Sequence, residues 1–271
     1  MPADAFALAL GAAVLHALWN VLLARTHDPR AATACAFCIG VVIVAPVAAA
    51  RWRVEAGAWK YIAASAAFEL VYVLLLGAAY AAAPLSVFYP IARGLAPVLV
   101  LAVAALALGA GTSVHEAIGV CTVGAGILLV RGRRPDRAAT LFGLSIAATI
   151  SGYTLVDNTG VTLADPFVYL VLSMIVPAFG SALVVGVRQG TAVLRRGVRL
   201  ETVLIAPLTL APYALVLYAL RVSPAAPVAA VRESSVVFVT VLAAALLHER
   251  VSRWRGAGAA VVVAGVVLLA V

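Results

Sequence analysis

The stretch 83–111 reads APLSVFYPIARGLAPVLVLAVAALALGAG and contains one charged residue, Arg93. A helix rises about 1.5 Å per residue, so roughly 20 apolar residues cover the roughly 30 Å of hydrocarbon in a bilayer. This stretch is therefore long enough and apolar enough to cross a membrane as one helix. Pro90 and Pro97 predict kinks in that helix, because a proline inside a helix removes a backbone hydrogen bond.

Similar apolar stretches fill nearly all of the 271-residue chain. Hydrophobic residues make up 65% of the sequence and charged residues 11%, whereas soluble domains carry about 25% charged residues. The connecting segments are too short to form a soluble domain. The sequence therefore predicts an all-α polytopic membrane protein with ten transmembrane helices, near residues 5–25, 31–50, 58–81, 85–109, 114–130, 138–158, 165–187, 200–220, 225–248 and 255–271.

The two halves of the chain resemble each other. The stretch 223–251, SPAAPVAAVRESSVVFVTVLAAALLHERV, aligns with the stretch quoted first, and Glu233 then falls on Arg93. A second match places YTLVD (153–157) on HALWN (16–20). The resemblance indicates an internal repeat.

Each predicted half holds five helices, and an odd number makes the second half enter the membrane from the opposite side. An inverted repeat of this kind is a common plan of secondary transporters. We therefore predict a first five-helix repeat at 1–130, a basic loop, RGRRPDR, at 131–137, and a second five-helix repeat at 138–271.

Basic residues predict the orientation of the chain in the membrane. Thirteen lie in loops after odd-numbered predicted helices and four in loops after even-numbered ones, and Arg93 and Arg232 inside helices complete the total of 19. The positive-inside rule then places the arginine-rich loops in the cytoplasm and both termini outside. The same loops account for the formal net charge of +8, so no nucleic-acid partner is expected.

Three cysteines, Cys35, Cys38 and Cys121, all fall in apolar stretches. The first two form a C-x-x-C pair, but a structural zinc site needs four ligands, and no further Cys or His cluster supplies them. We interpret all three as packing residues and expect no metal and no cofactor. The sequence also lacks a glycine-rich phosphate-binding loop, so transport driven by ATP within this chain is not expected.

Four charged residues lie deep inside predicted spans, Glu69, Arg93, Arg232 and Glu233, and a fifth, Asp157, lies in the last turns of its span. Each is a candidate functional residue, because a charge at mid-bilayer costs roughly 2.5–3.5 kcal/mol on insertion scales. The signs nearly cancel, which predicts pairing of Glu69 with Arg93, and of Glu233 with Arg93 or Arg232. The alternative is a set of ion pairs that only fixes the register of the helices.

Polar residues recur three or four positions apart in several predicted helices, and such residues share a helix face. Together they predict a polar cavity with aromatic walls, suited to a small organic solute. The carboxylates of Glu69, Asp157 and Glu233 are also candidates for proton coupling. The candidate substrate-binding residues are His16, Trp19, Asn20, Glu69, Tyr72, Tyr89, Arg93, Tyr153, Asp157, Tyr213, Arg232 and Glu233.

The predicted helices 114–130 and 255–271 are rich in glycine and alanine. Small residues let helix backbones approach closely within a membrane. We expect these two helices to be structural, packing within the chain or at a dimer contact. The chain is accordingly expected to be a monomer or a homodimer.

Several motifs resemble the EamA branch of the drug/metabolite transporter superfamily: HALWN at 16–20, APLSVFYPIARG at 83–94 and ALLHER at 245–250. The resemblance covers the whole chain. It implies an inverted-repeat fold with a central cavity, and export or exchange of a small metabolite, such as an amino acid or an amphipathic organic compound, without ATP. Members of the family are usually drawn with both termini in the cytoplasm, which is opposite to the orientation that the arginine count predicts.

The sequence thus predicts a secondary transporter that works by alternating access in the cell (inner) membrane. Its expected partners are a small-molecule substrate, the lipid bilayer and, as a candidate coupling ion, the proton.

FYPIARG (88–94) with YTLVD (153–157) also resembles a subfamily associated with phosphonate utilisation, so uptake of a phosphonate-like anion is the alternative. An enzyme is not expected, because no spacing puts a serine and a histidine on one helix face. A non-transporting scaffold or sensor would not need five buried charges.

Overall fold

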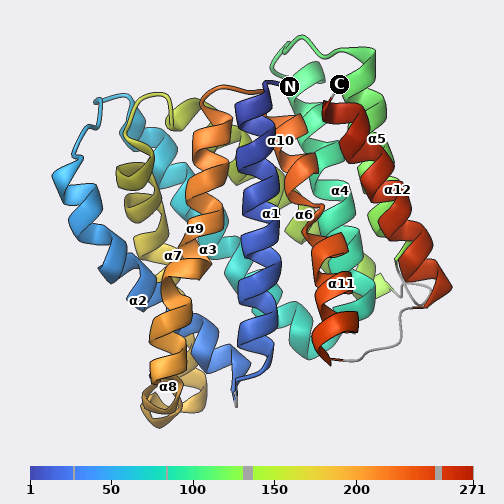
Figure 1. Ribbon diagram of the computed structural model, residues 1–271. Helices are drawn as coiled ribbons and strands as arrows, with labels where there is room; N and C mark the ends of the chain where they lie inside the picture. Colours follow the sequence, from blue (N-terminus) through green and yellow to red (C-terminus); the bar gives the residue numbers. More distant parts are fainter. Residues whose placement is uncertain (27, 84, 131–136, 248–251, 271) are drawn as a thin grey trace.

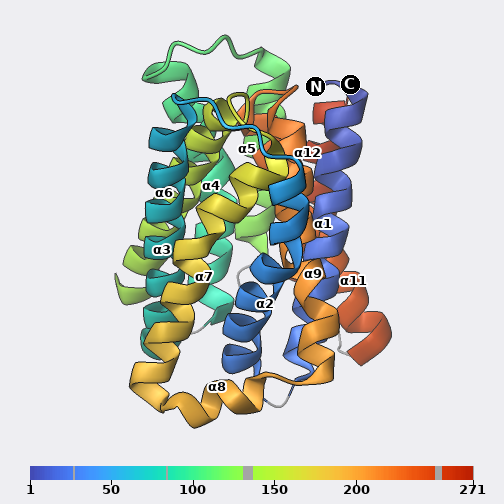
Figure 2. The ribbon, with the colours of Figure 1, turned by 90° about the vertical axis from the view of Figure 1, so that its left-hand side faces the viewer.

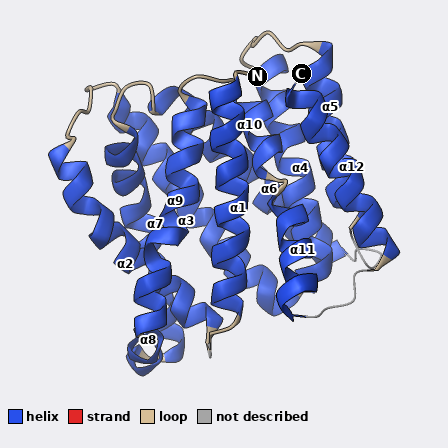
Figure 3. Ribbon diagram, in the orientation of Figure 1, coloured by secondary structure: helices blue, strands red, loops and turns tan. Residues whose placement is uncertain are grey.

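The structure is a computed structural model that describes residues 1–270 apart from 27, 84, 131–136 and 248–251. The described part consists of helices joined by loops (Figure 3). The helices are α1 (Ala3–Ala24), α2 (Pro29–Ala50), α3 (Ala58–Ala82), α4 (Leu85–Leu106), α5 (Val114–Leu129), α6 (Arg137–Gly160), α7 (Pro166–Gln189), α8 (Thr191–Gly197), α9 (Leu200–Leu220), α10 (Ala225–Arg232), α11 (Ser235–Leu247) and α12 (Arg253–Ala270).

Among the described residues, nine helical segments are long and apolar enough to cross a membrane, and α5 is a shorter apolar helix of 16 residues. The predicted all-α polytopic fold is therefore confirmed. Large apolar side chains such as Leu106, Val187 and Leu204 are exposed on the outside of the bundle, as expected for a surface that faces lipid.

Two details of the helix prediction are wrong. The segment 225–248 was expected to be one helix, but α10 ends at Arg232 and α11 begins at Ser235. The loop between the seventh and eighth predicted spans contains the additional short helix α8. Parts of two quoted motifs, the basic loop at 131–136 and the end of ALLHER, lie outside the described residues.

The helices form one bundle whose two termini lie at the same end, with α8 at the opposite end (Figures 1 and 2). Helix α6 packs against both α3 and α4, α1 packs against α9, α10 and α11, and α5 packs against α12. Helices of the predicted first and second halves therefore interleave, and the centre of the bundle is built from both. The relation of the two halves as inverted repeats stays a prediction.

Local sequence explains where several helices begin. The Asp28 side chain accepts a hydrogen bond from the Ala31 backbone at the start of α2, and Asp165 does the same for Phe167 at the start of α7. Ser113 and Glu116 form a reciprocal capping box at the start of α5. These side chains satisfy backbone N–H groups that have no partner within the helix.

The interruption between α10 and α11 is a tightened turn. The Ser234 N–H donates to the Val231 carbonyl at 3.0 Å, and the Val236 N–H donates to the Glu233 carbonyl at 3.1 Å, both three residues back along the chain. Such a turn inside a membrane-spanning segment frequently marks a functional position. It places Glu233 and Ser234 where the helix changes its winding.

Helices α5 and α12 approach closely through glycines, which confirms packing within the chain. A Cβ added to Gly126 would lie 2.7 Å from the backbone nitrogen of Val262 and 2.9 Å from the carbonyl oxygen of Gly258. A Cβ added to Gly265 would lie 2.7 Å from the backbone nitrogen of Val123. These contacts leave no room for a side chain.

We expect Gly126→Ala to lower the free energy of unfolding by about 1–3 kcal/mol, because the added methyl group would push two backbones apart. The matched control is Gly256→Ala in α12, where a Cβ has no neighbour within 4 Å. Thermal unfolding of the detergent-purified variants would measure both effects. Equal melting temperatures for the two variants would show that the close approach does not stabilise the bundle.

Candidate functional site

Arg93, in α4, is the centre of the buried polar contacts and is only 3% exposed. Its Nη1 atom lies 3.0 Å from Oε1 of Glu233, its Nε atom donates to the Tyr89 hydroxyl at 3.2 Å, and its Nη2 atom lies 2.6 Å from Nε2 of His16. Glu233 is 1% exposed. The predicted pairing of Arg93 with Glu233 is thus confirmed, and it links α4 to the turn that follows α10.

The contact between Arg93 and His16 fixes the state of the imidazole. A guanidinium group has only donors and no acceptor, so Nε2 of His16 must accept the hydrogen bond. A ring nitrogen that accepts carries no proton. His16 is therefore neutral here, with its proton on Nδ1, and it adds no charge to the site.

Arg232 lies beside the same carboxylate. Its Nε atom is 3.7 Å from Oε1 of Glu233, and its Nη2 atom donates to the Tyr153 hydroxyl at 3.1 Å. The Arg93 cluster, as we name it, consists of the side chains of His16, Tyr89, Arg93, Tyr153, Arg232 and Glu233.

Several polar atoms in and near this cluster are buried and have no hydrogen-bond partner among the described residues. They include Oε2 of Glu233, Nε of Arg232, Oγ of Ser234 and Nε1 of Trp19. A buried polar atom without a partner costs about 1–3 kcal/mol. Both donors and an acceptor are thus left available beside the α10–α11 turn.

A second group of polar contacts surrounds Asp157, near the end of α6. The Tyr169 hydroxyl donates to Oδ1 at 2.9 Å, and the Tyr213 hydroxyl donates to Oδ2 at 2.7 Å. The hydroxyl groups of Tyr213 and Ser65 lie 3.3 Å apart. The Asp157 cluster therefore joins α3, α6, α7 and α9, and its carboxylate has hydroxyl partners in place of an arginine.

Glu69 was expected to pair with Arg93, and that prediction is wrong. Within the described residues, Glu69 has no hydrogen bond and no ion pair, although it is only 8% exposed. The reason is the helix order: α6 packs between α3, which carries Glu69, and α4, which carries Arg93. Glu69 nevertheless lies within electrostatic range of Asp157, Arg232 and Arg93.

The remaining predicted residues lie around the two clusters. Tyr72 contacts Tyr153 edge to face, with ring centroids 6.3 Å apart, and Trp19 contacts His16 in the same manner at 5.2 Å. Asn20 donates to the backbone carbonyl of His16 at 2.6 Å, within its own helix. Its side-chain amide nitrogen thus bonds locally and not to the charged residues.

Sequence reasoning missed Ser65 and Tyr169, which complete the Asp157 cluster. Tyr169 lies in the first turn of α7, and Ser65 lies one turn before Glu69 on α3. The spacing of Ser65 from Glu69 was a usable signal, since residues four apart share a helix face. The contact of Tyr169 with Asp157 depends on how two helices meet, which no spacing within one helix reveals.

The described residues contain no group of three or more His, Cys, Asp or Glu side chains that could hold a metal ion. The C-x-x-C pair does not converge: Cys35 Sγ contacts the Leu194 carbonyl, and Cys38 Sγ contacts the Ala178 carbonyl, each at 3.4 Å. Both sulfur atoms pack between helices, as expected. Cys121, which was also interpreted as a packing residue, is exposed.

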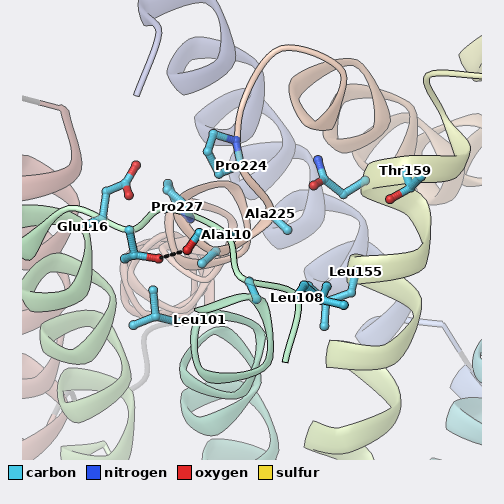
Figure 4. A pocket seen from close by; sticks show the side chains of 14 residues that line it. Leu101, Leu108, Ala110, Glu116, Leu155, Thr159, Pro224, Ala225 and Pro227 are labelled. Atoms are coloured by element: carbon cyan, nitrogen blue, oxygen red, sulfur yellow. Dashed lines mark hydrogen bonds between the residues drawn. The ribbon is translucent and has the colours of Figure 1, made fainter. Parts of the chain in front are cut away.

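A small cavity of about 90 Å³ lies between α4, α5, α6 and the start of α10 (Figure 4). Its walls include Leu101, Leu155, Asn158 and Pro227. Pockets that bind small molecules measure roughly 300–1,000 Å³, so this cavity is small for a substrate site. We do not assign it as the substrate site.

An ion pair joins two loops at the end of the bundle that carries the termini. Arg51 Nη2 lies 3.1 Å from Oδ2 of Asp165, and the Asp165 N–H donates to the Arg53 carbonyl at 2.9 Å. The hydrogen bond from Arg51 to Asp165 and their attraction raise the pKa of Arg51 above its ordinary value. Because Arg51 is half exposed, this pair holds the loops together only weakly.

The helix bundle with buried charges at its centre defines a multi-pass membrane protein. Residues 137–271, which include α6 to α12, match the model of the EamA-like transporter family. The chain belongs to this family, which is part of the drug/metabolite transporter superfamily. It is therefore a membrane transporter of this type, and a small-molecule substrate follows from the family.

A solved crystal structure is similar to 99% of this chain, over 98% of its own chain, with a TM-score of 0.74 and 17% sequence identity. At that identity the likeness shows the fold alone. It extends over the first half of the chain, beyond the residues that the family model matches. No curated protein matches the sequence.

We expect Tyr213→Phe to lower the free energy of unfolding by about 1.5–3 kcal/mol, because it removes a buried hydrogen bond to a carboxylate. The control is Tyr218→Phe, whose hydroxyl lies 3.5 Å from the half-exposed Arg51 and should contribute little. Thermal unfolding in detergent would measure the difference. A Tyr213→Phe variant as stable as Tyr218→Phe would mean that the Asp157 cluster does not stabilise the bundle.

Proposed function

We propose that the chain is a secondary transporter that moves a small metabolite by alternating access, with its substrate site at the Arg93 cluster. Support comes from the membership of the transporter family and from the position of the cluster between the predicted halves. The observation that carries the proposal is the buried Arg93–Glu233 pair, 3.0 Å between Nη1 and Oε1, at an interruption of a membrane-spanning helix.

The interrupted helix supports this placement of the site. Transporters of several folds bind substrate near mid-membrane, where a discontinuous helix exposes polar groups. Here the interruption lies next to polar atoms of Glu233, Ser234 and Arg232 that form no hydrogen bond within the described part of the chain. These atoms are suited to bind polar groups of a substrate, and so is the Nε1–H of Trp19 in α1, which has no hydrogen-bond partner among the residues that the structure describes.

Alternating access requires the two ends of the site to open in turn. Prolines lie inside α2, α4, α7 and α9, at Pro46, Pro90, Pro97, Pro177, Pro207 and Pro212. Each removes one backbone hydrogen bond and so weakens its helix locally. We propose that these positions absorb the bending that the transport cycle requires.

Protons are the coupling ion that the site favours. Glu69, Asp157 and Glu233 are the three buried carboxylates of the central bundle in the described structure. A carboxylate can carry a proton through the cycle and release it when an arginine approaches. Exchange of one solute for another, with no proton, is the alternative that the experiments below distinguish.

A ligand screen tests the transport proposal. Purified protein in detergent would be heated with amino acids, amphipathic cations or phosphonates. A ligand that binds only the folded state stabilises it by about 2.7 kcal/mol at 100 times its dissociation constant. We expect one class to raise the melting temperature saturably, and to lose the effect in Arg93→Ala. No shift with any class, together with no solute flux in reconstituted vesicles, would favour a non-transporting scaffold.

Flux of the stabilising solute into vesicles would test proton coupling. We expect Glu69→Gln, Asp157→Asn or Glu233→Gln to slow pH-driven flux and to flatten its dependence on pH, because an amide cannot carry the proton. The matched control is Glu201→Gln, at an exposed position in the first turn of α9. Wild-type rates and an unchanged pH profile in all three variants would exclude these carboxylates as proton carriers.

A further inference from the structure

The buried charges of the central bundle do not balance. In the described structure they comprise two guanidinium groups, of Arg93 and of Arg232, whose side chain is 12% exposed, and three carboxylates, of Glu69, Asp157 and Glu233. His16 is neutral because its Nε2 atom accepts from Arg93. With every carboxylate ionised, the set carries one negative charge in excess, and an uncompensated charge inside a membrane is costly.

Glu69 is the carboxylate that lacks a partner. Glu233 is bound by Arg93, and both oxygen atoms of Asp157 accept tyrosine hydroxyl groups. Glu69 is 8% exposed and has no hydrogen bond or ion pair within the described part of the chain. A cation that balances the excess negative charge would therefore bind beside Glu69.

From these observations we infer that Glu69 is the binding site for one monovalent cation, at which a proton and the protonated amine of an amphipathic substrate replace each other. The inference deepens the proposed transport function and rests on it. Binding of a cation brings the buried set to neutrality. A zwitterion would leave the excess negative charge in place, and an anion would increase it.

The surroundings of Glu69 suit a cation with an apolar body. Tyr72 lies one turn along α3, and its ring contacts that of Tyr153 from α6. Aromatic faces attract cations, and tyrosine hydroxyls can accept a hydrogen bond from an ammonium group. The titratable and charged groups that face Glu69 are Tyr72 on its own helix, Arg93 on α4, Tyr153 and Asp157 on α6, Tyr213 on α9 and Arg232 on α10.

The two arginines near Glu69 are held away from it. Arg93 is bound to Glu233, His16 and Tyr89, and Arg232 is bound to Tyr153 beside Glu233. Both arginines therefore attract the Glu69 carboxylate from a distance but form no ion pair with it. Glu233 keeps the guanidinium groups from neutralising Glu69 directly, and so leaves that carboxylate available for an exchangeable cation.

Three ligands that share a phenylethyl body and differ in charge test the inference: phenethylamine, phenylalanine and 3-phenylpropanoate. Calorimetric titration of the purified protein, in two buffers that differ in ionisation enthalpy, would report affinity and the number of protons released. We expect phenethylamine to bind at least about tenfold more tightly than either of the others, a difference of about 1.4 kcal/mol. It should release close to one proton and bind more weakly as the pH falls.

Glu69→Gln should abolish the binding of phenethylamine and the release of the proton. The matched control, Glu55→Gln, changes an exposed loop carboxylate and should leave both unchanged. Folding of the variant is checked by its melting temperature without ligand, which should stay close to that of the wild type, because glutamine has the shape of the protonated, uncharged glutamate that is present when no amine is bound. Binding of phenethylamine to Glu69→Gln with wild-type affinity, or without proton release, would overturn the inference.

The outcomes also separate this inference from the proposed function. Tighter binding of phenylalanine or 3-phenylpropanoate would overturn cation selectivity and leave the transporter proposal standing. The absence of binding by all three would overturn the amine site. The transporter proposal would fail with it only if no solute of the wider screen shifted the melting temperature or crossed the membrane of the vesicles.

Discussion

The ion pair between Arg93 and Glu233 is the interaction on which the centre of this bundle depends. Its Nη1 and Oε1 atoms are 3.0 Å apart and almost completely buried, and it joins α4 to the turn between α10 and α11. Removing two charges from water costs several kcal/mol for each ion, so such a pair persists only with good geometry and further hydrogen bonds. Here His16 and Tyr89 accept two such hydrogen bonds from Arg93.

The buried polar residues form two groups of contacts, one around this pair and one around Asp157. The Arg93 cluster holds both guanidinium groups around one carboxylate, whereas Asp157 is held by tyrosine hydroxyl groups. Glu69, on α3, lies outside both sets of bonds. In our account, the first group binds and orients the substrate, and Glu69 supplies the exchangeable charge that couples its movement to that of a proton.

The sequence predicted much of this arrangement, because hydrophobicity and charge act over whole helices. Apolar length predicted the membrane-spanning helices, and the alignment of Glu233 with Arg93 predicted their pairing. The interruption after Arg232 was not predicted, since SSVVFV reads as continuous helix and the tightened turn depends on packing. The Glu69–Arg93 pair was wrong because helix order is a tertiary property: α6 lies between the two helices. The contact of Tyr169 with Asp157 was not predicted for the same reason, because it depends on how two helices pack.

A charge-reversal cycle on the central pair tests the account most directly. Arg93→Glu, Glu233→Arg and the double reversal would be compared by thermal unfolding in detergent. The account predicts that each single reversal lowers the melting temperature strongly, because it places two like charges together, and that the double reversal recovers part of the loss. The recovery should correspond to a coupling energy of about 0.5–3 kcal/mol. A double variant whose loss equals the sum of the two single losses would contradict the claim that this pair holds the centre of the bundle together.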